Sequence, residues 1–239
     1  MENKNIYGVI LAGGIGTRMG NVEKPKQFLK IGGKPIIVHT IEKFVLNDSL
    51  EAVVVLTPEQ WINHTKDLIK KYAPFAENVH VIEGGESRNH TIMNAIDFIE
   101  EKFGLDEETI IVTHDSVRPF VSHRIIEENV KYALEYGACD TVIPATDTIV
   151  KSDNGNTITE IPERSMMYQG QTPQSFKAKK LKKLYMELTE KEKEILTDAC
   201  KIMVLKGEKV YLVEGETSNM KVTYPYDLEV AEALLGGNK

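Results

Sequence analysis

The sequence predicts a single α/β domain with a mostly parallel central sheet flanked by helices. Short runs of β-branched residues alternate with helical patterns, which is typical of βαβ units. Glycines and polar residues follow several of these runs, as expected where strands end. The chain has 239 residues, of which 41% are hydrophobic and 27% charged, and this suits one globular domain over residues 1–239. Together these observations indicate a Rossmann-like architecture.

The first half of the chain supplies most of the expected parallel strands. They lie at Ile6–Leu11, Ala52–Leu56, Val79–Ile82 and Ile110–Thr113. A helix from about Pro58 to Lys71 follows the second strand, and a capping box at Thr57–Gln60 is expected to start it. Apolar residues recur at helical spacing after the third strand, at Ile92, Ala95, Ile96 and Ile99. Ser122 is expected to cap a further helix after the fourth strand.

The pattern changes after a strand at Thr141–Pro144. Residues Thr148–Val150 and Thr157–Ile161 flank an Asn154-Gly155 turn, which predicts a protruding β-hairpin arm at about 147–165. An isolated hairpin is only marginally stable in water, so the arm is expected to pack on the domain or on a second subunit, and a homodimer is favoured. The remaining expected elements are helices near 177–188 and 198–206, a strand at 210–213 and a helix near 225–235.

The composition limits the classes of partner. A formal net charge of −7 argues against nucleic acid and against a polybasic membrane anchor, because both need an excess of Lys and Arg. Cys139 and Cys200 are far apart and lack metal-site or redox-pair spacing. No run reaches the ~18 apolar residues of a membrane span, and the stretch at residues 6–12 is too short for a signal peptide. We expect a soluble protein of the reducing cytoplasm.

Four glycines between Gly13 and Gly20 follow the first strand, where their backbone can approach a phosphate closely. A dinucleotide fingerprint is disfavoured, because Gly20 comes one residue late and no acid ends the second strand. A plain strand-to-helix turn is the alternative. Arg18 and Lys26 add positive charge beside the glycines, and a lysine can stabilise charge on a phosphoryl group under attack. Lys24 is expected to be solvated.

A second candidate site follows the third and fourth strands. Backbone amides and hydroxyls at Gly84–Thr91 could bind a pyrimidine edge, although Thr91 alone is better explained as a helix cap. Polar residues at His114–Pro119 fall where ligands collect in open α/β sheets. Asp115 could hold Mg²⁺ directly or through water, or form an ion pair with Arg118. His114 lacks metal-like partner spacing and is expected to be a hydrogen-bonded structural residue.

Six motifs extend over nearly the whole chain, at Leu11–Gly20, Pro25–Gln27, Gly84–Arg88, His114–Pro119, Tyr168–Phe176 and Asn219–Thr223. Through them the chain closely resembles bacterial ribitol-5-phosphate cytidylyltransferases, which are relatives of the 2-C-methyl-D-erythritol 4-phosphate cytidylyltransferases. The resemblance implies one nucleotidyltransferase domain that joins CTP to D-ribitol 5-phosphate, giving CDP-ribitol for teichoic-acid or related polymers, and pyrophosphate. Methylerythritol phosphate is the alternative acceptor. A non-catalytic nucleotide sensor is the alternative from a different class, and it would not need both sets of cations.

The resemblance also implies roles for individual residues. Arg18 and Lys26 would stabilise the transition state, while Arg164 and Lys221 would position the incoming phosphate. Contacts with CTP are implied for Leu11, Ala12, Gly13, Gly14, Gly85, Glu86, Ser87, Arg88, Asn89, Thr91 and Ser116. Contacts with the polyol phosphate are implied for Arg118, Thr148, Arg164, Thr172 and Lys221. Mg²⁺ or another divalent cation is the implied cofactor, with Asp115 as its expected ligand, and Arg164 is expected to reach the site of a partner subunit.

Overall fold

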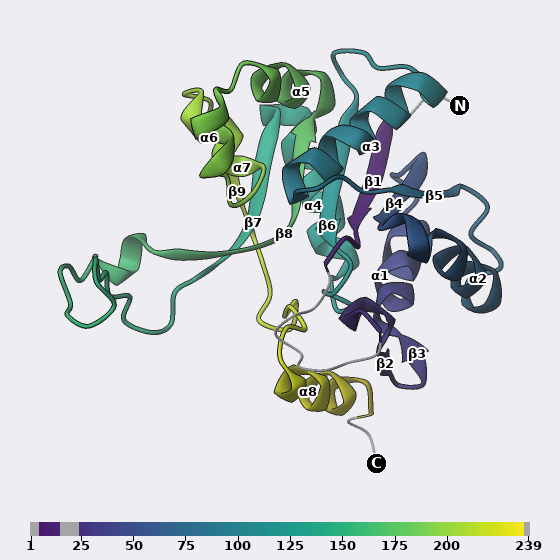
Figure 1. Cartoon of the computed structure of the whole chain (residues 1–239), viewed down its shortest axis with the longest axis horizontal. Coiled ribbons are helices and arrows are strands. Elements are labelled where there is room, and N and C mark those ends of the chain that lie inside the picture. The colour runs from purple at the N-terminus through teal and green to yellow at the C-terminus, as the bar shows by residue number, and fades with distance from the viewer. Residues whose placement is uncertain (1–4, 15–23, 237–239) are drawn as a thin grey trace.

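A seven-stranded sheet with strand order β5-β4-β1-β6-β8-β7-β9 forms the centre of the molecule (Figure 1). The computed structural model describes residues 5–14 and 24–236. The strands of this sheet are β1 (Ile6–Leu11), β4 (Ala52–Thr57), β5 (Val79–Glu83), β6 (Ile110–Asp115), β7 (Ala138–Pro144), β8 (Tyr168–Lys177) and β9 (Tyr211–Glu214). A separate hairpin is formed by β2 (Lys30–Ile31) and β3 (Lys34–Pro35).

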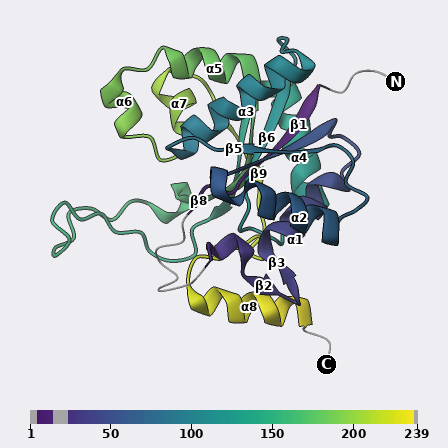
Figure 2. The same ribbon diagram turned by 45° about the vertical axis from the view of Figure 1, so that its right-hand side comes forward.

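Helices cover both faces of the sheet (Figure 2). They are α1 (Ile36–Val45), α2 (Ile62–Tyr72), α3 (Arg88–Phe103), α4 (His123–Tyr136), α5 (Ala178–Met186), α6 (Glu190–Glu194), α7 (Cys200–Leu205) and α8 (Pro225–Gly236). None of the helices in the described part of the chain is long and apolar enough to cross a membrane.

Strand β1 shows why three layers form. Tyr7, Val9 and Leu11 pack in one core with α3, α5 and α7, whereas Ile6 and Ile10 pack in another with α1, α2 and α4. Successive side chains of a strand point to opposite faces, and every residue of β1 is buried, so apolar layers must cover both sides. The predicted α/β fold with a mostly parallel sheet is confirmed, because only β8 runs antiparallel to its neighbours in this sheet.

The strand order places a crevice beside the end of β1. This strand pairs in parallel with β4 on one side and with β6 on the other, and Leu11 lies level with Leu56 and Asp115. Where the order of parallel strands reverses in this way, the connections leave on opposite faces and a ligand-sized crevice opens at the carboxyl ends. The fold therefore directs attention to the residues that follow β1, β5 and β6.

Strand β8 was not predicted as an element, and neither were α1, α6 and the β2–β3 hairpin. The residues of β8 are mostly polar and include Pro173, a composition that disfavours a central strand. Residues 171–176 of the strand are nevertheless buried, because neighbouring elements supply hydrogen-bond partners. The Thr141 hydroxyl donates to the Pro173 carbonyl at 2.7 Å, and the Ser175 hydroxyl donates to Asn129 Oδ1 at 3.1 Å. Side-chain hydrogen bonds thus replace the apolar packing that usually identifies such a strand.

The expected capping box before α2 is wrong. Thr57 is the last residue of β4, and its hydroxyl has no hydrogen-bond partner among the described residues. Pro58 leads into a short 3₁₀ turn, Glu59–Trp61, and α2 begins after that turn. The cap at Ser122 is confirmed, because its hydroxyl oxygen accepts a hydrogen bond from the Ile125 amide at 3.4 Å.

The segment between β7 and β8 protrudes from the sheet (Figure 1). Lys151 and Glu160 form an isolated antiparallel bridge in it, so the arm pairs at one point and not along the ladder of a regular hairpin. Asn154 Oδ1 accepts hydrogen bonds from following amides, and Gly155 takes a positive φ of 74° in the turn. Large apolar side chains are exposed on the arm, namely Val150, Ile158, Ile161 and Met166.

Asp140 on β7 gives the folded state a pH dependence that can be tested. Burial raises the pKa of the Asp140 carboxyl to about 6, although a hydrogen bond from Gln174 Nε2 at 3.0 Å opposes the rise. Between the usual pKa of 3.8 and about 6, the folded chain therefore holds a proton that the unfolded chain has lost. The contribution of Asp140 to stability is greatest below this window and falls as the pH rises through it.

Replacing Asp140 by Asn removes the charge and keeps an acceptor for Gln174. We expect Asp140→Asn to raise the free energy of unfolding at pH 7.5 by about 1–3 kcal/mol and to change it little at pH 4. Urea denaturation at the two pH values measures this, with Asp153→Asn in the exposed turn of the arm as the matched control. An equal gain at both pH values would show that charge burial is not the cause.

Candidate active site

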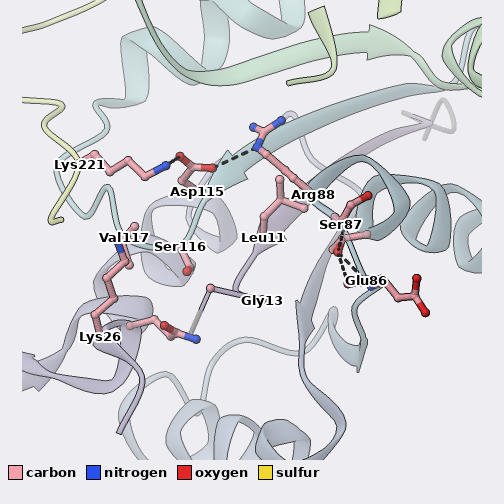
Figure 3. Close-up of a pocket in the computed structure, with 14 residues that line it drawn as sticks. Leu11, Gly13, Lys26, Glu86, Ser87, Arg88, Asp115, Ser116, Val117 and Lys221 are labelled. Carbon is pink, nitrogen blue, oxygen red and sulfur yellow. Dashed lines mark hydrogen bonds and ion pairs between the residues drawn. The ribbon is translucent and has the colours of Figure 1, made fainter. Parts of the chain in front are cut away.

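A cavity of about 370 Å³ lies at the carboxyl ends of β1 and β6, beside the start of α3 (Figure 3). Its walls come from five segments of the chain, and the lining residues are Leu11, Gly13, Gly14, Lys26, Gln27, Gly85, Glu86, Ser87, Arg88, Thr91, Asp115, Ser116, Val117 and Lys221. Most of the residues expected to contact CTP, together with Lys26 and Lys221, are thus brought together at the edge of the sheet where parallel strands end.

The backbone after β1 is open towards this cavity. A Cβ atom added at Gly13 or Gly14 would have no atom of the described residues within 4 Å. Packing among the described residues therefore does not require glycine at either position, and the missing side chains leave room for a ligand to approach the backbone closely. Gln27 fixes the end of the strand, because its Nε2 donates to the Ala12 carbonyl at 2.7 Å.

The start of α3 forms the opposite wall. Ser87 is the N-cap, and its hydroxyl oxygen accepts from the His90 amide at 3.1 Å. Thr91 is not the helix cap that its position suggested: its hydroxyl accepts from the Gly85 amide at 3.0 Å and donates to the Ser87 carbonyl at 2.8 Å. A Cβ at Gly85 would lie 2.6 Å from the His90 ring, so this glycine is needed for packing. The N-terminus of a helix favours negatively charged ligands.

Asp115 lies between three cationic side chains. Its Oδ2 is 2.7 Å from Lys221 Nζ and 3.8 Å from Arg118 Nε, and its Oδ1 is 3.5 Å from Arg88 Nε. Lys221 and Arg88 point toward it from opposite sides (Figure 3). Burial raises the pKa of the Asp115 carboxyl, but the three nearby positive charges outweigh burial and hold that pKa well below its usual range. The expected ion pair between Asp115 and Arg118 is present, and its distance of 3.8 Å is the longest of the three.

One cationic donor in the cavity wall is not satisfied by the described residues. Arg88 lines the cavity, and its Nη1 is buried without a hydrogen-bond partner among them. Guanidinium N–H groups are strong donors to phosphate oxygens, and leaving them unpaired is costly. Lys26, only 7% exposed, adds a further positive charge to the wall, and Glu86 points away from Asp115 (Figure 3). The cavity therefore suits a ligand with several negative charges.

A chain of hydrogen bonds behind the cavity holds Asp115 in place. His114 Nε2 lies 3.1 Å from the Arg118 carbonyl, which can only accept, so Nε2 carries the proton. His114 Nδ1 then accepts from the Thr172 hydroxyl at 2.8 Å, and Thr172 Oγ1 accepts from the Asp115 amide at 3.2 Å. Burial lowers the pKa of His114 to about 4 and keeps the ring neutral. The expectation of a structural histidine is confirmed, and neither Thr172 nor Arg118 lines the cavity.

Several predicted site residues lie elsewhere. Ala12 and Asn89 are buried and are not among the residues that line the cavity. Thr148 and Arg164 belong to the arm and do not line the cavity either. Arg18 lies outside the described residues. The structure thus unites two of the four expected catalytic cations, Lys26 and Lys221, in one cavity.

Two residues to which the sequence assigned no role hold the loop that carries Lys221. Asn219 is fully buried; its Nδ2 donates to the Thr172 carbonyl at 2.8 Å and to Gln171 Oε1 at 3.1 Å. The Asn219 carbonyl accepts from Arg118 Nη1 at 2.8 Å. Gln171 and Asn219 both fall within the sequence motifs, but a motif does not reveal that residues 48 positions apart bond to one another.

The carboxylates at this site could bind a divalent cation only together with a phosphate-bearing ligand. Among residues 5–14 and 24–236, no three or more His, Cys, Asp or Glu side chains gather as a metal site. Mg²⁺ commonly uses one or two carboxylates together with substrate phosphates, so a single carboxylate such as that of Asp115 would be enough for an ion that also binds a phosphate ligand. Because Asp115 already pairs with cations, a bound divalent ion would rely mainly on phosphate oxygens.

Solved structures share this fold over almost the whole chain. The 4-diphosphocytidyl-2C-methyl-D-erythritol synthase of Anaerococcus prevotii matches with a TM-score of 0.80 and 25% identity, covering 97% of this chain and 96% of its own. The 2-C-methyl-D-erythritol 4-phosphate cytidylyltransferase of Francisella tularensis matches with a TM-score of 0.78 and 26% identity, covering 95% and 98%. The Thermus thermophilus cytidylyltransferase of the same name gives a TM-score of 0.71 at 24% identity, covering 95% and 98%.

The sequence pattern of one family accounts for nearly all of this chain. The description of that family is 2-C-methyl-D-erythritol 4-phosphate cytidylyltransferase, and its pattern matches residues 6–237. The matched region includes every segment that lines the cavity, from Leu11 to Lys221. The chain belongs to the 2-C-methyl-D-erythritol 4-phosphate cytidylyltransferase family, and it is a CTP-dependent nucleotidyltransferase with a sugar phosphate as second substrate.

Proposed function

We propose that this cytidylyltransferase transfers CMP from CTP to D-ribitol 5-phosphate, giving CDP-ribitol and pyrophosphate. The observation that carries the proposal is the presence of cations from separate segments in one cavity: Lys26 from the turn after β1, Arg88 from the start of α3 and Lys221 from the loop before α8. Two phosphate-bearing substrates repel each other, so each needs a positive group that is in place before reaction. A protein that only sensed CTP would need one such group.

The choice of acceptor rests on sequence motifs. Residues Leu11–Gly16 and Met167–Gln171 are similar to those of ribitol-5-phosphate cytidylyltransferases. The names of the matched family and of the solved relatives favour methylerythritol phosphate instead, and this is the second candidate. The sequence identity to those relatives is only 24–26%, and proteins that share a fold at this level can use different acceptors. Both compounds are polyol phosphates, and the phosphate-binding cations would serve either one.

The proposed chemistry is one in-line displacement. The triphosphate of CTP lies along the open backbone at Gly13 and Gly14, with the cytosine near the start of α3. A phosphate oxygen of the acceptor, held by Lys221, attacks the α-phosphorus while Lys26 stabilises the charge that builds there. The bond from the α-phosphorus to the bridging oxygen breaks, and pyrophosphate leaves. A divalent cation, Mg²⁺ in this proposal, would neutralise triphosphate oxygens, with Asp115 available as its protein ligand.

The arm supports the proposal that the enzyme works as a homodimer. Arg164 and Thr148, expected to contact the acceptor, lie on a segment that extends away from the sheet (Figure 1). Arg164 Nη1 donates only to the arm's own Thr146 carbonyl at 3.2 Å among its described hydrogen bonds. In a dimer that exchanged arms, these side chains would complete the cavity of the second subunit.

The acceptor can be identified by measuring pyrophosphate release. With CTP and Mg²⁺ we expect D-ribitol 5-phosphate to give a kcat/KM at least roughly tenfold above that of 2-C-methyl-D-erythritol 4-phosphate. A site that binds the hydroxyls of one polyol leaves some of its polar groups unpaired when the other polyol is bound. The opposite order would establish the second candidate. Absence of release with both compounds would contradict the proposed function.

Lys26 is expected to act in the transition state. Lys26→Ala should lower kcat by roughly 10²–10³-fold while the fold and the binding of CTP persist, since a preorganised charge is lost. Steady-state kinetics and circular dichroism measure the two properties. Lys24→Ala, a change two positions away at an exposed lysine, is the matched control. Near-normal turnover in a folded Lys26→Ala protein would remove this role.

Lys221 is expected to act on the acceptor. Lys221→Ala should raise the KM for the polyol phosphate by about 10–10²-fold and leave the affinity for CTP nearly unchanged, because Lys221 is proposed to hold the acceptor phosphate. Initial rates at varied acceptor, and CTP titration by calorimetry, separate the two effects. Lys209→Ala, at an exposed lysine before β9, serves as the control. A loss confined to CTP binding would contradict this assignment.

A further inference from the structure

A third apolar cluster lies apart from the two cores that cover the faces of the sheet. Its buried members are Ile31, Ile36, Val117, Val222 and Ala231, and Leu29, Phe120 and Leu228 pack against them. They come from the β2–β3 hairpin, the start of α1, the loop after β6, the loop before α8, and α8 itself. In both overall views α8 lies beside β2 and β3, away from the main sheet (Figures 1 and 2).

The members of this cluster are adjacent in sequence to residues of the active site. Val117 lines the cavity itself, and Val222 directly follows Lys221. The Val222 amide donates to the Val117 carbonyl at 2.9 Å, so the two loops are joined side by side. Leu29 and Ile31 follow the 3₁₀ turn that carries Lys26. The two cations proposed to act on the two substrates therefore lie on segments that share one small core.

Helix α8 is bonded to both of these segments. At its start, Asp227 Oδ2 accepts from the amides of Thr223 and Tyr224, at 2.7 and 2.8 Å. Further along, the Glu232 carboxylate accepts from the Gly32 amide at 3.0 Å. Ala231 is fully buried between these contacts. The helix is thus fixed to the loop of Lys221 at one end and to the β2–β3 turn at the other.

We propose that α8 is a positioning element, in which Leu228, Ala231 and Glu232 set the place of Lys221 relative to Lys26. The proposal rests on the roles given to these two lysines under the proposed function. Lys221 lies in a loop without regular secondary structure, and the side chain after it packs under α8. A displacement of about 1 Å at a reacting group can cost on the order of 10²-fold in rate, so this packing has a direct effect on catalysis.

Truncating Leu228 tests the proposal without touching the cavity. We expect Leu228→Ala to lower kcat/KM for the acceptor by roughly 10-fold, with CTP affinity unchanged, because Lys221 loses its support. Glu229→Ala, at the adjacent exposed position of the same helix, is expected to behave as the wild type. Glu232→Ala, which removes only the tether to Gly32, replaces Leu228→Ala if the latter does not fold.

A double-mutant cycle distinguishes positioning from a general loss of stability. If Leu228 acts through Lys221, then adding Leu228→Ala to Lys221→Ala should cause little further loss of kcat/KM. The same factor of loss in both backgrounds would overturn the proposal, because the effect would then be independent of Lys221.

Hydrogen–deuterium exchange gives a readout that does not depend on the substrate. Leu228→Ala should speed exchange in peptides covering residues 116–118 and 219–223, and Glu229→Ala should not. Unchanged exchange in both segments would also overturn the proposal. If the wild-type protein used neither acceptor, the proposed function would fail while the exchange result still decided the role of α8.

Discussion

The short ion pair between Asp115 and Lys221 is the interaction on which the rest of the site depends. It joins the end of a central strand to a loop 106 residues further along the chain, at 2.7 Å. Asp115 is buried, and a buried carboxylate without partners would be strongly unfavourable. The fold can therefore keep this charge only by bringing cations to it, and two of them, Arg88 and Lys221, also line the cavity.

A set of further hydrogen bonds holds this charged arrangement in place. His114 and Thr172 hold the Asp115 backbone, while Asn219 holds the loop of Lys221 against Thr172 and Arg118. Bonds of this kind polarise one another in a buried setting, so the group is stiffer than any single contact suggests. The result is a site whose charges are fixed before a ligand arrives, as electrostatic catalysis requires.

The sequence revealed the parts of the fold that follow apolar patterning. Strands β1, β4, β5 and β6 were predicted within two residues, and so was the clustering of polar residues at their ends. Strand β8 was not predicted, because its burial depends on hydrogen bonds with Asn129 and Thr141, which are distant in the chain. The positioning roles of Gln171 and Asn219 were not predicted for the same reason. Patterns of spacing report local structure, whereas side-chain partners are decided by the tertiary fold.

The third apolar cluster has a consequence for how the enzyme is made. Its members range from Leu29 to Ala231, and they lie next to the segments that bring Lys26 and Lys221 to the cavity. Synthesis on the ribosome proceeds from the N-terminus, and the sheet segments emerge first. If α8 has the positioning role proposed for it, the two lysines would be set against each other only after α8 has left the exit tunnel, so a nascent chain that lacks α8 would carry an incomplete active site.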